Sequence, residues 1–502
     1  MSADEPLWHP DAQRIAGSRL QAFIEQVQFR SGKSFESYAD LHQWSIDQRE
    51  HFWANVWDYC GVQASVKSEV VLSNADDFMR AQWFPDAMLN FAENLLRYDD
   101  DRCALVGLFE NGDRESLSYS ELLMQVTELA SALRRHGIVP GDRVVGFMPN
   151  IIQTVVAMLA SSSLGATWSS CSPDFGITGV CDRFGQITPR ILFSVDAYQY
   201  NGRLVDCLER VKAIQEKITS IEKTIVVPLV SDTPDFSDHT ETLLYADFVR
   251  SSQKEVLHYE QLPFDHPQYI MYSSGTTGVP KCIVHGAGGT LIQHLKEHQL
   301  HTDIDRDDVL FYYTTCGWMM WNWLVSGLAS GCTVVLYEGS PFASNGDRLL
   351  DVIDAEGITV FGTSARYIAS LQKAGKRPMA SHDLSSLKTI LSTGSPLVQE
   401  SYDYVYREVK ADVCLASISG GTDIISCFVL GHPALPVHRG EIQSKGLGMA
   451  VEIWTEEGNS VTGEKGELVC TLPFPSCPIG FWNDLNREKY QSAYFNRFDK
   501  VW

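Results

Sequence analysis

Between about residue 100 and residue 430, short apolar runs alternate with stretches of helical periodicity, and this alternation restricts the fold more than any other feature. The first expected strand, 104–108, is followed by a helix that opens at Ser118 with Glu121 three residues later, which is a capping box. Further strands are expected at 144–148, 191–194, 224–227, 269–272, 333–337, 358–361 and 389–392. The pattern is typical of the α/β class.

The chain divides into three expected parts. Its 502 residues exceed what one hydrophobic core usually supports. Residues 1–80 are rich in tryptophan and charge and predict a helical lead-in that covers the core, whereas residues 81–430 predict paired α/β subdomains carrying the site. Helical patterns fade after about residue 430, and short β runs at 450–454 and 467–471 predict a small β subdomain over 431–502.

Charge and cysteine content restrict the possible ligands and the cellular compartment. The formal net charge is −23, from 63 acids against 40 bases, so long-range attraction to nucleic acid is not expected. A small phosphorylated ligand remains possible because a few backbone N–H groups and one divalent cation can hold it. The twelve cysteines are scattered, and neither a targeting segment nor an apolar run of about 18 residues is seen, which favours a soluble cytoplasmic protein.

The string YSSGTTGVPK at 272–281 directly follows an expected strand and carries the most specific chemistry. Four hydroxyl side chains and two glycines within six residues make a loop whose backbone can approach a phosphate closely, and Lys281 adds a cation. The spacing is not that of a Walker loop. An ordinary Ser/Gly-rich loop is the alternative interpretation.

The complete string resembles the signature of the adenylate-forming superfamily, which includes acyl-CoA synthetases, luciferases and peptide-synthetase adenylation domains. The resemblance implies a layered α/β large N-terminal domain, with two α/β subdomains and a small β-barrel. In that family the loop wraps the triphosphate of ATP, so the implied ATP contacts are Ser273, Ser274, Gly275, Thr276, Thr277, Gly278 and Lys281.

Two further segments follow in the family's order. Gly394, Ser395 and Pro396 resemble the turn along the adenine, which would otherwise be a generic turn. The segment Ser419, Gly420, Gly421, Thr422 and Asp423 resembles the one in which a threonine contacts the α-phosphate and an acid holds Mg²⁺. Asp423 stands where many relatives have Glu, and on its own it would more often be a cap. Thr277, Lys281, Thr422 and Asp423 are therefore the expected catalytic set.

Three stretches, 285–298, 317–323 and 417–427, resemble those short-chain acyl-CoA synthetases that activate acetoacetate. Gly420 aligns with an aromatic residue that closes the acyl pocket of acetate-specific relatives, so its small size is expected to make room for the larger acid. Trp318, Met319 and Met320 would line the pocket with adaptable apolar surface. Trp321 and Trp323 are at least as well explained as core residues, and Asn322 could donate to the ketone oxygen.

For CoA, the resemblance points to 198–203, where relatives often carry two arginines. Here Arg203 is retained and Tyr200 takes the other place; an exposed, salt-bridging Arg203 is the alternative. The loop 172–176 is expected along the pantetheine path. His294, Glu297 and His298 fit an H-x-x-E-H zinc pattern, but no distant third ligand presents itself and a packed helix is preferred.

The implied reaction joins acetoacetate to CoA through an acyl-adenylate, with ATP converted to AMP and pyrophosphate and Mg²⁺ as the metal. Family members continue for about one more small domain that carries a catalytic lysine. The sequence stops at Trp502, just before the family's ribose-binding Gly-Asp pair, so weak ATP binding and poor adenylation are expected of it alone. The alternatives are a synthetase for acetate, propionate or 3-hydroxybutyrate, and a non-catalytic nucleotide-binding fragment.

Overall fold

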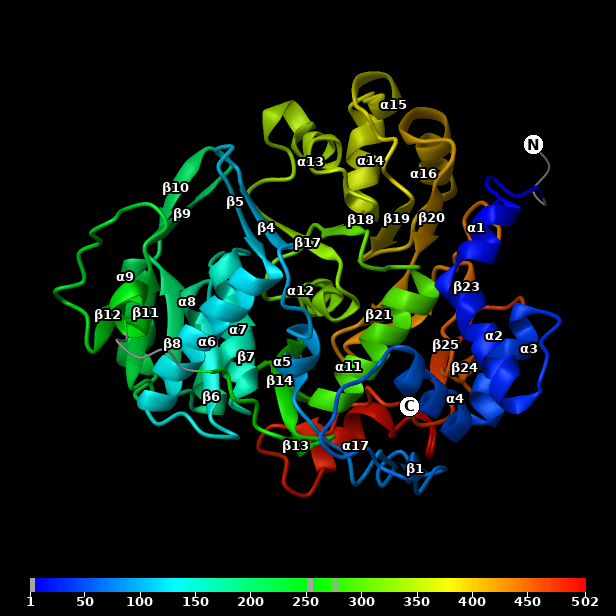
Figure 1. Cartoon of the computed structure of the whole chain (residues 1–502), viewed down its shortest axis with the longest axis horizontal. Helices are drawn as coiled ribbons and strands as arrows, with labels where there is room; N and C mark the ends of the chain where they lie inside the picture. Colours follow the sequence, from blue (N-terminus) through cyan, green and yellow to red (C-terminus); the bar gives the residue numbers. More distant parts are fainter. Residues whose placement is uncertain (1–4, 251–255, 274–277) are drawn as a thin grey trace.

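The structure is a computed structural model and describes residues 5–250, 256–273 and 278–502. Two large sheets organise it, and both consist mainly of parallel strands (Figure 1). In spatial order the first contains β12 (Thr242–Leu244), β11 (Lys223–Val227), β8 (Ile191–Val195), β6 (Arg143–Phe147), β7 (Thr167–Cys171), β14 (Pro267–Ser273), β15 (Lys281–Gly286) and β26 (Gly480–Phe481). The second contains β20 (Cys414–Ser417), β19 (Thr389–Thr393), β18 (Val360–Ser364), β16 (Val309–Tyr312), β17 (Thr333–Glu338), β4 (Cys103–Phe109) and β5 (Arg114–Ser118).

Both sheets are covered on both faces, which explains why their strands are nearly continuous apolar runs. Successive side chains of a strand point to opposite faces. Leu310 thus belongs to the central core, whereas Phe311 packs into a second core on the far side of its sheet. Val144 and Val145 of β6 divide in the same way between the central core and a third core. The expected layered α/β fold is confirmed.

Helices fill the space between the sheets and cover their outer faces. In the middle, α7 (Ile152–Ser163) contacts β4 of one sheet and β6 and β7 of the other, and α6 (Tyr119–Arg135) packs beside it. The capping box at Ser118 and Glu121 is present. The short helix α10 (Tyr245–Val249) also packs beside α6. The outer helices are α8 (Ile177–Ile187), α9 (Leu208–Lys217), α13 (Arg348–Glu356), α14 (Ala365–Lys373), α15 (Pro378–Ser381) and α16 (Gln399–Tyr404), with the short elements η3 (Ser344–Gly346) and η4 (Val405–Val409).

The N-terminal part of the chain forms α1 (Ala12–Gly17), α2 (Arg19–Ser31), α3 (Tyr38–Asp47) and α4 (Arg49–Tyr59), which lie together at one side of Figure 1. Phe23, Phe52 and Trp53 are buried in the central core. Next follow the pair β1 (Leu72–Ser73) and β2 (Gln82–Trp83), then β3 (Met88–Leu89), which pairs with β13 (Leu262–Pro263), and α5 (Phe91–Leu95).

The segment 431–502 contains the antiparallel pair β24 (Val451–Trp454) and β25 (Glu467–Cys470), close to the expected strands. It also joins the remaining fold: β23 (Ser444–Lys445) pairs with β22 (Ser426–Leu430), and β26 pairs with β15. A helix that the sequence analysis did not foresee, α17 (Glu488–Tyr494), follows β26. The expected strand at 358–361 begins at Val360, because Gly357 ends α13 in a left-handed conformation with φ of 61°.

Within residues 5–250, 256–273 and 278–502, helices long and apolar enough to cross a bilayer are absent.

Candidate active site

The Ser/Thr-rich segment connects β14 to β15. The two strands are antiparallel, and Ser273 at the end of β14 pairs with Lys281 at the start of β15. Ser274, Gly275, Thr276 and Thr277 lie outside the described residues. Gly278 has a φ of 115°, a conformation that a side chain would strain. This pairing fixes Lys281 opposite Ser273, at the start of β15.

The second part of the site is the turn between β21 (Ser419–Gly421) and β22, which contains Thr422 and Asp423. The Tyr494 hydroxyl of α17 donates to Asp423 Oδ1 over 2.6 Å. Burial raises the pKa of Tyr494, and the charge of Asp423 raises it further, so this phenol remains protonated and keeps donating. Below the turn, His285 Nε2 lies 2.9 Å from the backbone oxygen of Thr422.

Tyr494 brings the two parts together. Lys281 Nζ lies 5.9 Å from the centroid of the Tyr494 ring and 5.7 Å from that of Phe481. Lys281 and Asp423, 142 positions apart in the numbering of the chain, thus share one tyrosine. His285, on the same strand as Lys281, adds a direct link to the Thr422 backbone. A cation, a carboxylate and the base of a hydroxyl-rich loop meet at one place, which suits a metal-bound polyphosphate.

The remaining nucleotide segments follow two adjacent parallel strands. Gly394, Ser395 and Pro396 come directly after β19 and are exposed, and Gly394 has a φ of 87°. Ser419 follows β20, the parallel neighbour of β19. Thr393 Oγ1 donates to the Ile418 backbone oxygen over 2.9 Å and joins the two strand ends. Carboxyl ends of parallel strands are a common place for ligands.

Gly420 is held by close backbone approach. A Cβ at this position would lie 2.0 Å from the Ser426 carbonyl oxygen and 2.6 Å from Cys427 Cα, because β21 pairs with β22 here. The direction in which a side chain would point is already filled by β22. The interpretation that Gly420 leaves an open volume for the acyl group gains no support from this arrangement, and the glycine is explained by the strand contact.

The expected acyl wall lies on and beside α12 (Met319–Val325). Trp318 is 62% exposed, whereas Met319 and Met320 are buried. Trp321 Nε1 donates to Asn150 Oδ1 over 3.0 Å, and Trp323 Nε1 donates to Glu297 Oε2 over 3.0 Å. These two tryptophans are therefore fully bonded core residues, as the alternative interpretation held.

Asn322 borders a small cavity of about 10 Å³, with Trp168, Tyr269 and Gly317 among its walls. A cavity of this size holds about one water molecule. Within the described residues, the Asn322 Oδ1 atom is buried and has no hydrogen-bond partner. The cavity therefore presents one unused acceptor.

The expected CoA residues lie on the exposed hairpin of β9 (Ala197–Tyr200) and β10 (Arg203–Asp206). Arg203 pairs with Tyr200 in its register, so both candidate positions sit at the tip. Glu110, which follows β4, anchors this tip by accepting the Asn201 N–H over 2.7 Å. It also accepts the N–H of Ser340, which follows the neighbouring strand β17, over 2.6 Å. In the loop 172–176, Phe175 packs under the Arg183 guanidinium at 4.6 Å.

The H-x-x-E-H residues are buried on α11 (Ala287–Lys296) and on η1 (Glu297–His301), a π-helical turn. His294 uses both ring nitrogens, one with Ser326 Oγ at 2.8 Å and one with the Ile425 oxygen at 2.6 Å. Glu297 accepts from the Ser426 hydroxyl and from the Cys427 N–H. The described residues contain no group of three or more His, Cys, Asp or Glu side chains arranged to hold a metal ion.

Sequence reasoning did not assign roles to Tyr494, His285 and Glu297. A signal for His285 existed, because residues 281, 283 and 285 share one face of a strand. The H-x-x-E-H pattern marked Glu297 but did not indicate its partners, and the role of Tyr494 had no local signal, since each residue acts on one more than 70 positions away.

The chain belongs to the family of AMP-binding enzymes, whose model matches residues 91–474; that of the acetyl-coenzyme A synthetase N-terminus matches residues 38–95. Within this family it groups with the acetoacetyl-CoA synthetases. It is 51% identical to the acetoacetyl-coenzyme A synthetase of Rhizobium meliloti (strain 1021), over 100% of this chain and 77% of that protein. The solved acetoacetyl-CoA synthetase from Streptomyces lividans matches with a TM-score of 0.94 and 43% identity, over 99% of this chain and 77% of that one. A malonamoyl-CoA synthetase of Penicillium aethiopicum is 42% identical over 99% of this chain and 71% of its own length.

Proposed function

We propose that the protein is an AMP-forming acid–thiol ligase that converts acetoacetate, ATP and CoA into acetoacetyl-CoA, AMP and pyrophosphate. The observation that carries the proposal is the meeting of Lys281 and Asp423 at Tyr494, in a chain that is 51% identical to an acetoacetyl-coenzyme A synthetase over its whole length.

The reaction has two steps. An acetoacetate oxygen attacks the α-phosphorus of ATP, the bond to the β-phosphate oxygen breaks, and pyrophosphate leaves. The CoA thiolate then attacks the acyl carbon of the mixed anhydride, and AMP leaves with the electrons of the broken C–O bond. Positioning and charge neutralisation dominate such chemistry. Lys281, Thr422 and the hydroxyl-rich segment 273–278 would bind phosphate oxygens, and residues 394–396 would border the adenine.

The donor set around Asp423 suits Mg²⁺. This ion is usually bound by one or two carboxylates together with substrate phosphates and waters, so one aspartate is enough when ATP brings the other ligands. Asp423 Oδ1 accepts from Tyr494, which leaves Oδ2 for the ion or its water. Bound there, Mg²⁺ would neutralise phosphate charge.

Trp318, Met319 and Met320 would border the acyl group, and Arg203 on its exposed hairpin would meet the CoA nucleotide. All twelve cysteines are free thiols, which supports a reducing compartment such as the cytoplasm.

Malonamate is a second candidate acid. It has the size of acetoacetate but carries an amide NH₂ where acetoacetate has a methyl group. The buried, unpartnered Asn322 Oδ1 could accept from that amide, and a site built to bond an N–H discriminates strongly against an analogue that lacks it.

The test is an assay of AMP and acyl-CoA formation with acetoacetate, malonamate, 3-hydroxybutyrate, propionate and acetate. We expect the highest kcat/KM with acetoacetate. A higher kcat/KM with malonamate would identify malonamate as the substrate instead of acetoacetate. A preference for acetate would overturn the assignment of acetoacetate. If ATP with Mg²⁺ raises the melting temperature but none of the acids yields AMP, the non-catalytic alternative would stand instead.

A further inference from the structure

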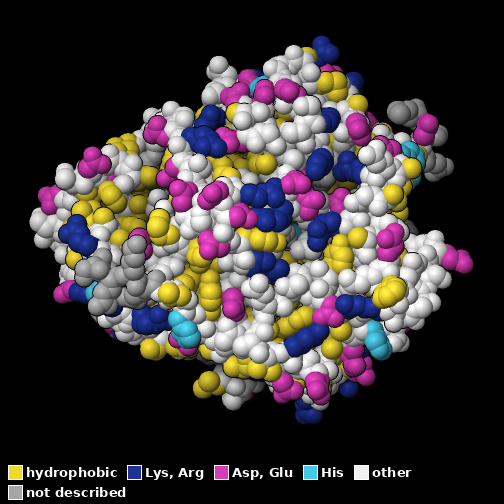
Figure 2. All heavy atoms as spheres, viewed as in Figure 1, with side chains coloured by type: hydrophobic (Ala, Val, Ile, Leu, Met, Phe, Trp, Pro, Cys, Tyr) yellow, Lys and Arg dark blue, Asp and Glu magenta, His cyan; other side chains and the backbone are white. Residues whose placement is uncertain are grey.

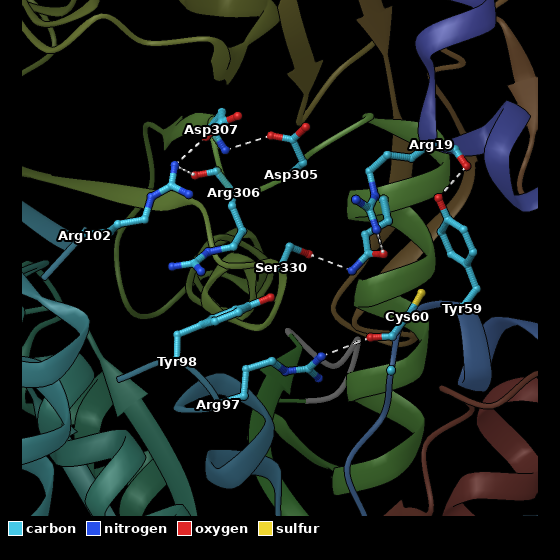
Figure 3. Close-up of a pocket in the computed structure, with 12 residues that line it drawn as sticks. Arg19, Tyr59, Cys60, Arg97, Tyr98, Arg102, Asp305, Arg306, Asp307 and Ser330 are labelled. Atoms are coloured by element: carbon cyan, nitrogen blue, oxygen red, sulfur yellow. Dashed lines mark hydrogen bonds and ion pairs between the residues drawn. The ribbon is translucent and has the colours of Figure 1, made fainter. Parts of the chain in front are cut away.

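A second cavity, of about 440 Å³, lies between the helical lead-in and the second large sheet (Figure 3). Its walls come from α2, from the turn after α4, from the end of α5, and from the loop that leads into β16. Four arginines line it: Arg19, Arg97, Arg102 and Arg306. In Figure 2, Lys and Arg side chains gather near the middle of a face that otherwise mixes both signs of charge.

This arginine pocket is separate from the candidate active site. Arg306 and Asp307 precede β16, and Ser330 precedes β17, so the pocket lies at the amino ends of these parallel strands. The segments at 394–396 and 419–423 follow the carboxyl ends of β19 and β20 in the same sheet. The two sites therefore lie at opposite ends of the strands of this sheet.

Two of the arginines are already neutralised. Arg102 pairs with Asp307, and Arg306 pairs with Asp100 at 2.6 Å. The other acid of the lining, Asp305, accepts the backbone N–H of Asp307 over 2.8 Å. In Figure 3, Asp305 and Asp307 lie together on the side away from Arg97.

Arg19 and Arg97 are held by neutral oxygens instead. Arg19 Nη2 donates to Gln299 Oε1 over 2.6 Å. Arg97 donates to the Cys60 oxygen over 3.1 Å and to the Asn94 oxygen over 3.0 Å. Across the described part of the chain, neither guanidinium forms a salt bridge with a carboxylate. Both stay cationic, because arginine is not deprotonated in proteins.

The Nε atoms of Arg19 and Arg306 are buried, so contact with a ligand falls to the Nη groups of these side chains. Arginine forks match the geometry of phosphate oxygens.

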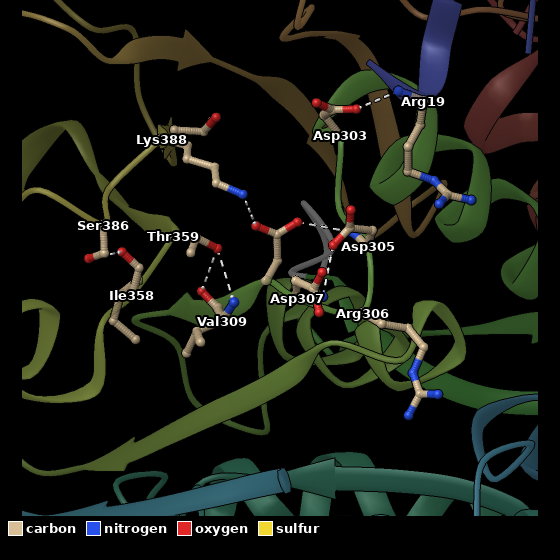
Figure 4. A network of polar contacts seen from close by, with 12 residues as sticks. Arg19, Asp303, Asp305, Arg306, Asp307, Val309, Ile358, Thr359, Ser386 and Lys388 are labelled. Atoms are coloured by element: carbon tan, nitrogen blue, oxygen red, sulfur yellow. Dashed lines mark hydrogen bonds and ion pairs between the residues drawn. The ribbon is translucent and has the colours of Figure 1, made fainter. Parts of the chain in front are cut away.

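The loop that presents Arg306 is fixed in place. Asp308 Oδ1 accepts from Lys388 Nζ over 2.9 Å, and Asp308 Oδ2 accepts the Asp305 N–H over 2.9 Å (Figure 4). On the other side, Asp303 Oδ1 accepts the Arg19 N–H over 2.7 Å. The pocket is therefore formed in advance, which lowers the entropic cost of binding.

We infer that the arginine pocket binds a small molecule through a phosphate group, with Arg19 and Arg97 as its charged contacts. The volume exceeds that of one phosphate ion and lies in the range of small-ligand sites. The ligand is either inorganic phosphate or a phosphomonoester.

The experiment is isothermal titration calorimetry of the purified protein with inorganic phosphate and, separately, with glycerol 3-phosphate, at constant ionic strength and mildly alkaline pH. We expect saturable binding that Arg19→Gln and Arg97→Gln each weaken at least about ten-fold, since bonds to charged groups contribute roughly 1.5–3 kcal/mol. The matched control is Arg30→Gln, which removes the same charge from α2 outside the pocket, at the pair of Arg30 with Asp58. It should bind as the wild type does.

Lys281→Ala distinguishes the two sites. If phosphate binds in the arginine pocket, this variant retains the binding, whatever its effect on catalysis. Loss of binding in Lys281→Ala would place the phosphate at the candidate active site and overturn the inference. Absence of saturable binding to the wild type, or unchanged binding in Arg19→Gln, would overturn it equally. Should Arg97→Gln fail to fold, the half-buried Arg19 still decides the question. The tighter of the two ligands identifies the source of the phosphate.

Discussion

Tyr494 is the side chain at which Asp423 and Lys281 meet, and it provides the first prediction. Tyr494→Phe keeps the ring beside Lys281 and removes the 2.6 Å hydrogen bond to Asp423. Because that bond orients a charged group, its loss should raise the KM for MgATP roughly ten-fold. Initial rates of pyrophosphate release measure this.

Tyr490→Phe is the matched control on the same helix. The Tyr490 hydroxyl is buried next to Arg487, and its removal leaves the Tyr494–Asp423 hydrogen bond in place. Its KM for MgATP should stay at the wild-type value. Equal effects of the two substitutions would contradict the role given to Tyr494.

The glycines at 420 and 421 provide a second prediction. A Cβ at Gly420 would collide with the β22 backbone, whereas one at Gly421 meets nothing within 4 Å. Gly420→Ala should therefore lower the free energy of unfolding by about 1–3 kcal/mol, as overpacking does, and Gly421→Ala should leave it nearly unchanged. Urea denaturation of both variants tests this, and a fully stable Gly420→Ala would show that an open volume lies there after all.

At the scale of elements, a buried ion pair lies where α11 meets η1. Lys296 and Glu297 are both fully buried with 3.5 Å between Nζ and Oε1, and burial lowers the pKa of Lys296. Glu297 also accepts from Trp323 and Cys427. Glu297→Gln leaves Lys296 without its counter-charge and should destabilise the protein by about 3–5 kcal/mol.

Glu222→Gln, which breaks a surface pair with Arg190, is the control for this prediction. It should cost less than about 1 kcal/mol. Chemical denaturation measures the free energy of unfolding of both variants. Similar losses in Glu297→Gln and Glu222→Gln would mean that the Glu297 carboxylate is not needed to hold β22 and α12 together.

The local sequence pattern was sufficient to predict most of the parallel strands and the helix α6. β6, β8, β11, β17 and β19 start and end within one residue of the predicted bounds, because buried strands are apolar runs bounded by turn residues. The α17 helix was not foreseen. Its N-cap, Arg487, is left-handed with φ of 56° and gives no side-chain cap, so the usual start signal is missing.

The site was predictable only as separate segments. The run ending in Lys281 and the Thr422–Asp423 turn each had a recognisable composition, but the tyrosine that joins them is set by the docking of α17 against β26. The Gly420 interpretation was made from residue size alone, without the position of β22. Side-chain volume does not reveal which backbone a residue approaches.

At the scale of the whole molecule, buried histidines make stability depend on pH. Burial lowers the pKa of His42 to about 4 and of His285 and His432 to about 3, and it lowers those of His294, His298 and His301 as well. The unfolded chain takes up these protons near the ordinary pKa of about 6.5, so unfolding becomes easier as pH falls below that value.

Three buried acids act in the opposite direction. Burial raises the pKa of Asp265 and Asp303 to about 6 and of Glu338 to about 7, so protonation of the folded state stabilises it as pH falls through those values. Because the six histidines outnumber the acids, the free energy of unfolding should fall by at least about 1 kcal/mol from about pH 7 to about pH 5.5. Urea denaturation across that range measures the slope, and a rise toward acid pH would contradict this balance.

The helix formed by α11 and η1 has no break from Ala287 to His301. At about 1.5 Å per residue it is a rod of roughly 22 Å. One end continues from the strand that begins at Lys281, and near the other end Gln299 holds Arg19. The residue that holds Arg19 and the strand that begins at Lys281 therefore belong to one continuous strand–helix segment, so the arginine pocket and the candidate active site share a single buried element.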